Sequence, residues 1–400
     1  MIFLDTDFKT IQIAVHSMTK DDVHDRVYRF LLPKTLSSQT PSHPSRQAMQ
    51  EALEHLYGAY VKTRSALYGD VHVNTFTLVF PNPSIVKDPD LFGSALGVLN
   101  EIVTQQTPST EAFDLEKRLL MEQWETLKEQ KRSYAGIRFS ARFYEGDPYA
   151  VPVTGTQEDL VSATYGKLSE TLADLRRSSS VLVVANGRLE EQWKTMLEDT
   201  FQSTETDLPT PSLGFRGPRE APVKIIEKTV MKQAILKVGH ILPVFRGDPL
   251  HDAAIVYDTV LGGYPDSILF TDVREKQGLC YDISSAYDPH KGTLVISAGV
   301  DRNRSDVALD SIARIVSDLK LERLSDESIE NAKRALVHQL RTLPESQSAI
   351  SSRALNQALF KTSGTIDERI GRIKSVTPDA VFDVARKVTH DMTYVLTGDD

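Results

Sequence analysis

The same order of alternating and helical hydrophobic patterns occurs twice along the chain. Each half contains a predicted strand, three helices and a closing strand. In the first half these lie at 75–80, from residue 90 onward, 115–129, 134–143 and 180–185. In the second half they lie at 293–300, 305–319, 328–340, 350–360 and 393–397. A repeat of about half the chain is too long for a solenoid, so it predicts two similar domains with a groove between them.

Local signals add elements to the first half. Residues 8–16 alternate between apolar and polar side chains, which predicts a strand. Residues 23–36 have a helical pattern, and we expect Pro33 to kink this helix or to end it early. Ser45 is a typical N-cap for the next helix, and Gly58 is a typical residue to end it.

The second half has similar signals. Strands are predicted at 223–227 and 233–240, and a helix opened by Asp248 and Pro249 follows. The stretch 279–287 is predicted as a strand with Leu279, Tyr281, Ile283 and Ser285 on one face. The alternation favours antiparallel sheets with helices packed on one side over a parallel doubly wound sheet. The predicted fold class is therefore α+β, with two tandem homologous domains that form a clamshell.

The clearest break in pattern lies at 202–222. This stretch contains four prolines and two glycines and has no helical periodicity. We interpret it as a linker between an N-terminal domain, 1–201, and a C-terminal domain, 223–400. The alternative is a long surface loop within one domain, and the repeated pattern on either side favours the linker.

Composition and charge indicate which classes of protein and partner fit this sequence. Of the 400 residues, 40% are hydrophobic and 25% are charged, as in ordinary globular proteins, and the net charge is −9. A negative net charge argues against nucleic acid or an anionic membrane as the main partner. No window approaches the ~20 apolar residues of a membrane span, and the N-terminus has no signal-peptide pattern. The single cysteine, Cys280, excludes an internal disulfide, so we expect a cytoplasmic protein.

One stretch of the second half carries a recognisable motif. Residues 269–285 read Leu-Phe-Thr-Asp-Val-Arg-Glu-Lys-Gln-Gly-Leu-Cys-Tyr-Asp-Ile-Ser-Ser. This resembles the C-terminal-domain signature of the insulinase-like and processing-peptidase metallopeptidases, the inverzincins. That signature has Arg-Glu-Lys, two further residues, a leucine, a tyrosine and a serine-rich strand. The flanking stretches 261–270 and 300–304 fit as well, and the resemblance covers most of the chain because the family is built as a tandem repeat.

The resemblance implies roles for Arg274 and Tyr281. In that family the matching arginine and tyrosine reach the substrate held at the zinc site of the other half. A guanidinium and a phenol are suitable donors for the charge that develops on a scissile carbonyl oxygen. The alternative from the residues alone is that Arg274 sits at a helix C-terminus, where a cation is favoured. Tyr281 is then an ordinary half-buried strand residue.

The zinc motif of the family is incomplete in this chain. The family signature, His-x-x-Glu-His on a helix, supplies two zinc ligands and a general base. Here Glu51 takes the place of the first histidine, whereas Glu54 and His55 match the base and the second histidine. The third ligand falls near Gln123, beside Glu122, and a neutral amide is a poor zinc ligand. The alternative is that these residues form an ordinary solvated helix face. The other histidines show no ligand spacing, and we expect most of them at the surface.

Three functions are compatible with this pattern. The favoured one is a non-metal-binding subunit or inactive homologue without a metal of its own, whose Arg274 and Tyr281 act on a peptide at the zinc of a related partner chain. The second is a non-catalytic peptide-binding or scaffold subunit, as a homodimer with a second copy. The third is an active metallopeptidase with an atypical, carboxylate-rich zinc site around Glu51 and His55.

Overall fold

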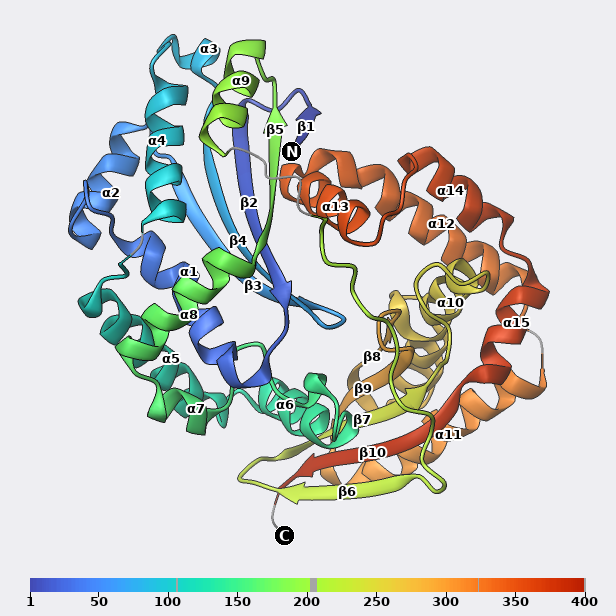
Figure 1. Ribbon diagram of the computed structural model, residues 1–400. Coiled ribbons are helices and arrows are strands. Elements are labelled where there is room, and N and C mark those ends of the chain that lie inside the picture. Colours follow the sequence, from blue (N-terminus) through green and yellow to red (C-terminus); the bar gives the residue numbers. More distant parts are fainter. Residues whose placement is uncertain (106, 202–206, 323, 399–400) are drawn as a thin grey trace. The chain divides into compact units, whose positions relative to one another are not determined.

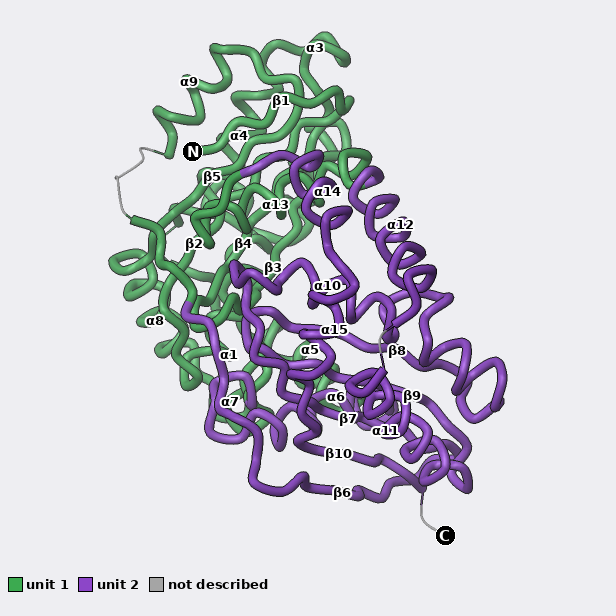
Figure 2. The backbone as a smooth tube through the Cα atoms, turned by 90° about the vertical axis from the view of Figure 1, so that its right-hand side faces the viewer, with its two compact units in different colours: residues 1–126, 151–211, 343–363 green, residues 127–150, 212–342, 364–400 purple. Residues whose placement is uncertain are grey.

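The computed structural model describes residues 1–105, 107–201, 207–322 and 324–398, and the chain forms two compact units (Figure 2). Unit 1 comprises 1–126, 151–211 and 343–363, and unit 2 comprises 127–150, 212–342 and 364–400. Of the predicted linker, residues 202–206 lie outside the described part. The chain passes between unit 1 and unit 2 at 126–127, 150–151, 211–212, 342–343 and 363–364, and the third of these points lies within the linker range.

Unit 1 is built on a five-stranded sheet with the order β1-β5-β2-β4-β3 (Figure 1). The strands are β1 (Ile2–Asp5), β2 (Thr10–Lys20), β3 (Tyr60–Tyr68), β4 (Val71–Pro81) and β5 (Ser180–Gly187). The pair β1–β5 is parallel, and the remaining pairs are antiparallel. Strand β3 therefore lies at an edge of the sheet, next to β4.

Unit 2 repeats this topology. Its sheet has the order β6-β10-β7-β9-β8, with one parallel pair, β6–β10, at the edge. The strands are β6 (Val223–Lys228), β7 (Gln233–Ile241), β8 (Cys280–Asp288), β9 (Thr293–Asp301) and β10 (Thr389–Thr397). The predicted α+β fold with two homologous units is confirmed. The sheets differ from the expectation in being mixed, because the first strand of each unit joins the edge in parallel.

Helices cover one face of each sheet. In unit 1 they are α1 (Arg26–Ser38), α2 (Arg46–His55), α3 (Pro83–Val86), α4 (Leu91–Thr104), α5 (Thr110–Leu127), α7 (Gln157–Ser162), α8 (Tyr165–Ser178) and α9 (Glu191–Thr200). In unit 2 they are α10 (His251–Asp258), α11 (Ser305–Leu321), α12 (Asp326–Thr342), α14 (Ile366–Ser375) and α15 (Pro378–Lys387). Ile13 and Phe92 are fully buried in the first core, and Leu236 and Val384 in the second. Burial of these faces is the main source of stability.

Each sheet also carries one helix on its opposite face, and that helix comes from the other half of the sequence. Helix α13 (Gln347–Leu359) packs Leu355 and Leu359 against Leu182 and Val184 of unit 1. Helix α6 (Lys131–Phe143) packs in the same way on β7 and β10 of unit 2. Helices α6 and α13 follow α5 and α12 in the repeat, so the two halves exchange equivalent helices. The prediction that helices pack on one side of each sheet is therefore incomplete, because α6 and α13 pack on the opposite side.

Several local predictions are tested by the backbone. The Ser45 side chain accepts a 3.0 Å hydrogen bond from the Ala48 amide, which confirms the N-cap. Gly58 follows the helix with φ 75°, a conformation that favours glycine. Pro33 does not end its helix early, because α1 continues through it to Ser38. Across the described residues, no helix combines the length and apolar character needed to cross a bilayer.

Candidate functional site

The helix that carries the incomplete zinc motif, α2, presents its motif residues to solvent. Met49 and Leu53 are buried and fix the orientation of the helix on unit 1. Glu51, Glu54 and His55 lie on the exposed side. The ring nitrogen Nδ1 of His55 lies 2.6 Å from the backbone oxygen of Glu51, so the imidazole is engaged with its own helix.

The carboxylates of α2 also bond within the helix. Nε2 of Gln47 donates to Oε1 of Glu51 at 2.8 Å. Nε2 of Gln50 donates to Oε1 of Glu54 at 3.2 Å. These are ordinary i, i+4 pairs of a solvated helix face.

The expected third-ligand region lies on α5. Glu122 and Gln123 are both exposed there, and Nε of Arg118 lies 4.0 Å from Oε1 of Glu122. Within the described ranges, no group of three or more His, Cys, Asp or Glu side chains is placed to hold a metal ion. The structure thus does not bring Glu51, His55 and Glu122 together as a ligand set.

Arg274 lies on the surface of unit 2. It belongs to a π-helical turn, Phe270–Lys276, whose Val273 is fully buried. The Arg274 side chain is exposed, and its guanidinium carbon lies 4.3 Å from the centre of the Phe270 ring. Stacking on an aromatic ring holds a guanidinium in place without neutralising its charge.

Tyr281 is exposed because β8 contains a bulge. The β8–β9 register shifts between Cys280 and Asp282, so Tyr281 is the extra residue. Its side chain is 54% exposed, whereas Ile283 and Ser285 are buried. The prediction that Tyr281 shares a face with Ile283 and Ser285 is therefore wrong, since the bulge breaks the alternation. The Tyr281 hydroxyl donates to Asp301, and this hydrogen bond and the negative charge of Asp301 raise the pKa of Tyr281.

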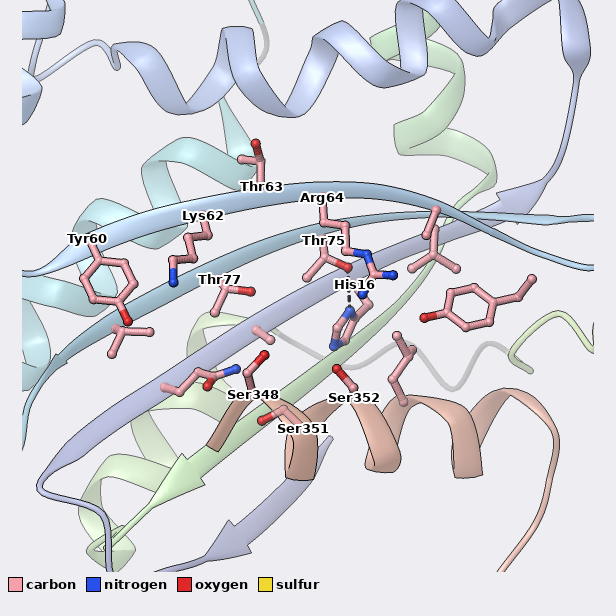
Figure 3. Close-up of a pocket in the computed structure, with 17 residues that line it drawn as sticks. His16, Tyr60, Lys62, Thr63, Arg64, Thr75, Thr77, Ser348, Ser351 and Ser352 are labelled. Carbon is pink, nitrogen blue, oxygen red and sulfur yellow. Dashed lines mark hydrogen bonds between the residues drawn. The ribbon is translucent and has the colours of Figure 1, made fainter. Parts of the chain in front are cut away.

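Unit 1 contains a cavity of about 320 Å³ between its sheet and α13 (Figure 3). Alternate residues of β2, β3 and β4 line one side of it, and residues of α13 line the other. Lys62 and Arg64 come from β3, His16 from β2 and Thr75 from β4. Such a volume is at the lower end of the range that small organic ligands occupy, roughly 300–1,000 Å³.

His16 is the most unusual residue of this cavity. Its side chain is 4% exposed, and Nδ1 lies 2.8 Å from Oγ1 of Thr75. The other ring nitrogen, Nε2, is buried without a hydrogen-bond partner among the described residues. Burial lowers the pKa of His16 to about 4, so the ring is neutral near neutral pH.

The expectation that most remaining histidines lie at the surface fails for three of them. His16, His72 and His240 are 4%, 1% and 2% exposed. Sequence reasoning also missed Lys62 and Arg64. Their spacing of two within 60–68 is the signal for one face of a strand, but the mixed polar composition of that segment obscured it.

The comparisons with known proteins agree with the motif. Residues 162–336 match the Peptidase M16 inactive domain. The chain is 27% identical to a "Probable inactive metalloprotease YmfF" from Bacillus subtilis (strain 168), over 98% of this chain and 93% of the relative. It is 26% identical to an "Uncharacterized zinc protease YmxG" from the same strain, over 88% of each chain. The chain is thus similar to insulinase-like peptidases over most of its length.

The fold of this chain is also found in a solved structure. A "conserved protein from Enterococcus faecalis V583" superposes with a TM-score of 0.90 at 23% identity, over 99% of this chain and 96% of that one. This chain is similar to an inactive-type homologue of insulinase-like peptidases, and its own zinc motif is incomplete. Glu51 replaces the first zinc histidine, and the neutral amide of Gln123 stands where a third ligand is expected.

Proposed function

We propose that the chain is the non-metal-binding partner of an insulinase-like zinc peptidase and that Arg274 and Tyr281 contact a peptide held at the partner's zinc. The observation that carries this proposal is the exposure of both side chains on unit 2. The guanidinium of Arg274 is stacked on Phe270 and is a preorganised donor, and the bulge exposes the Tyr281 hydroxyl, which donates to a peptide once it releases Asp301. Preorganised donors stabilise the negative charge that develops during amide hydrolysis.

The hydrogen bonds within α2 support a function in which this chain and a partner chain supply different catalytic groups. In this chain, Glu51 and His55 bond within their own helix. We therefore expect zinc and general base to come from a related, zinc-containing subunit. A second copy of this chain would bring the same incomplete motif, so it is the less suitable partner. The Bacillus subtilis strain has both a relative named an inactive metalloprotease and one named a zinc protease, the two kinds of chain that such a pair needs.

The test is reconstitution with a zinc-bearing relative from the same organism. Arg274→Ala should lower kcat of the pair by on the order of 10²-fold, as for loss of one oxyanion donor, and change KM less. Lys276→Ala is the matched control, because Lys276 is an exposed cation of the same turn that pairs with Asp272. Size-exclusion chromatography must show that both variants assemble. Unchanged turnover of an assembled Arg274→Ala pair would remove the proposed role.

A non-catalytic peptide-binding or scaffold subunit is the second candidate. The cavity of unit 1 favours it, because that cavity is complete within this one unit and requires no partner chain. The two candidates differ in one measurement. A scaffold binds peptide with or without Arg274, and its partner's turnover does not depend on that residue. The negative net charge supports peptide or protein partners, not nucleic acid or membrane, and a cytoplasmic location remains a prediction.

A further inference from the structure

The cavity of unit 1 carries positive charge that the protein itself does not neutralise. Lys62 and Arg64 extend from alternate positions of β3 into the cavity (Figure 3). None of the described lining residues is Asp or Glu. Nζ of Lys62 lies 4.7 Å from the centre of the Tyr60 ring, and neither cation has an ion pair within the described part of the chain. Unit 2 offers a contrast, because its exposed cation Arg132 is paired with Asp282.

A buried nitrogen also lacks a partner in the same cavity. Nε2 of His16 is enclosed and unbonded in the described structure, while Nδ1 is held by Thr75. Figure 3 shows the ring between β4 and the serines of α13. An unsatisfied buried polar atom costs about 1–3 kcal/mol, so a ligand atom that bonds Nε2 gains affinity. A hydrogen bond to Nε2 of His16 therefore orients the ligand in the cavity.

The first turns of α13 add donors on the opposite wall. Ser348 and Ser352 line the cavity, and neither hydroxyl has a hydrogen-bond partner among the residues that the structure describes. The start of the helix is anchored to the sheet by Gln347, whose Nε2 donates to the backbone oxygens of Thr10 and Asn186 at 3.0 and 2.8 Å. The N-terminal end of a helix favours negative charge.

The remaining wall is apolar. It is formed by alanine, valine and leucine side chains: Ala14, Ala66, Val73, Val79 and Leu355. A bare inorganic anion would use the cations and hydroxyls but not this wall. A carboxylate next to a small apolar side chain uses both, and a guanidinium binds a planar carboxylate through two parallel hydrogen bonds.

We propose that this cavity binds the C-terminal carboxylate of a short peptide together with its last, small apolar side chain. Lys62 and Arg64 bind the carboxylate, and His16 and the α13 serines bond the adjacent polar atoms. The ligand class rests on the proposed function, since peptides are the substrates of that function. The residues of this site belong to unit 1, whereas Arg274 and Tyr281 belong to unit 2.

The test uses the full chain alone, with trialanine as the probe. Calorimetry should show binding of the free acid, and binding of the trialanine C-terminal amide should be at least about tenfold weaker, as expected for loss of a charge-assisted pair. Lys62→Gln combined with Arg64→Gln should weaken binding of the acid by a similar factor. The matched control is Arg118→Gln combined with Arg177→Gln, two exposed cations on helices of unit 1 with the same change in net charge. This control should bind trialanine as the wild type does.

Three results would overturn the proposal. One is equal binding of the acid and the amide, and another is inorganic phosphate competing as well as the acid. The third is no binding by the folded wild-type chain at millimolar trialanine, judged with circular dichroism as the folding check. His16→Gln gives a second readout, because loss of a single imidazole signal identifies His16 in NMR spectra and trialanine should shift that signal. Arg274→Ala should bind trialanine unchanged, so failure of this site and failure of the proposed action in trans are separate outcomes.

Discussion

The hydroxyl of Tyr281 donates a 2.7 Å hydrogen bond to Oδ1 of Asp301. Tyr281 is the extra residue of the β8 bulge, and Asp301 is the last residue of β9. The bulge exposes the ring, and the carboxylate fixes the direction of its hydroxyl. Because a phenol has one proton, the Tyr281 hydroxyl must release Asp301 before it donates to a peptide, and the pair gives the proposed action in trans a second test.

In the reconstituted pair, Tyr281→Phe should lower kcat by on the order of 10²-fold, because it removes one donor to the developing oxyanion. Asp301→Asn should change kcat less, since the hydroxyl remains and loses only a charged acceptor that competes for its proton. In a Tyr281→Phe background, Asp301→Asn should have no further effect on kcat, because Asp301 then has no hydroxyl to accept from. Steady-state kinetics of the three variants measure this coupling. Additive losses would show that Asp301 acts independently of Tyr281.

Much of the strand order could be predicted because it repeats. Equal spacing of apolar strands and amphipathic helices in the two halves led to two similar units, and the sheets have the same order of strands. Side-chain periodicity, however, indicates only that a helix buries one of its faces. It does not indicate which sheet that face packs against. Helices α6 and α13 have ordinary amphipathic patterns, so their exchange between the halves is decided by tertiary packing alone.

The same limit applies to single residues. Tyr281 was placed on the wrong face because strict alternation assumes a regular register, and a bulge has no reliable sequence signal. His16 was expected at the surface because histidine is often exposed, yet it lies beneath α13, which is more than 300 residues away in the sequence. The motif residues Glu51, Glu54 and His55 were found from sequence, since their spacing on one helix is a local property.

The chain alone should not hold stoichiometric zinc. Glu51 and His55 are exposed and bonded within α2, and two ligands without a firm third do not make a tight site. Protein purified without chelators should contain well below one zinc ion per chain by metal analysis. Glu51→Ala and His55→Ala should leave this content unchanged. Near-stoichiometric zinc that is lost in either variant would favour the active metallopeptidase with an atypical site.

Helix α6, which is exchanged between the halves, packs closely on Gly239 of β7. A Cβ added at Gly239 would stand 2.5 Å from Cε2 of Phe143 and 2.8 Å from Cζ of Phe139. Gly239→Val should therefore destabilise the protein by about 1–3 kcal/mol through overpacking. Gly136→Ala in α6 is the contrasting control, because nothing lies within 4 Å of the added Cβ. It should be neutral or stabilising by roughly 0.5–1 kcal/mol, since alanine is the better helix former.

Urea unfolding followed by circular dichroism compares these two variants with the wild type. A Gly239→Val protein as stable as the wild type would show that α6 does not pack closely on β7 in solution. Because α6 comes from the first half of the sequence, the same result would question the exchange of helices between the units. Loss of stability in Gly239→Val with none in Gly136→Ala locates the effect at the contact between ring and backbone.

Buried histidine should make stability depend on pH. His240 of β7 is 2% exposed, and burial, with a smaller effect from His390, lowers its pKa to about 3. The unfolded chain binds a proton near pH 6.5, so between about pH 6.5 and 3 the unfolded state holds more protons. The contribution of neutral His240 is therefore complete above pH 6.5 and decreases as the pH falls.

His240→Gln removes this titration. From about pH 7.5 to about pH 5, the variant should lose about 2 kcal/mol less stability than the wild type, as that shift in pKa requires. His338→Gln, at an exposed histidine of α12, is the matched control and should follow the wild type. Urea midpoints at the two pH values measure the difference. An equal loss of stability in His240→Gln and wild type would contradict this prediction. It would mean that His240 takes up its proton in the folded state, although the side chain is buried there.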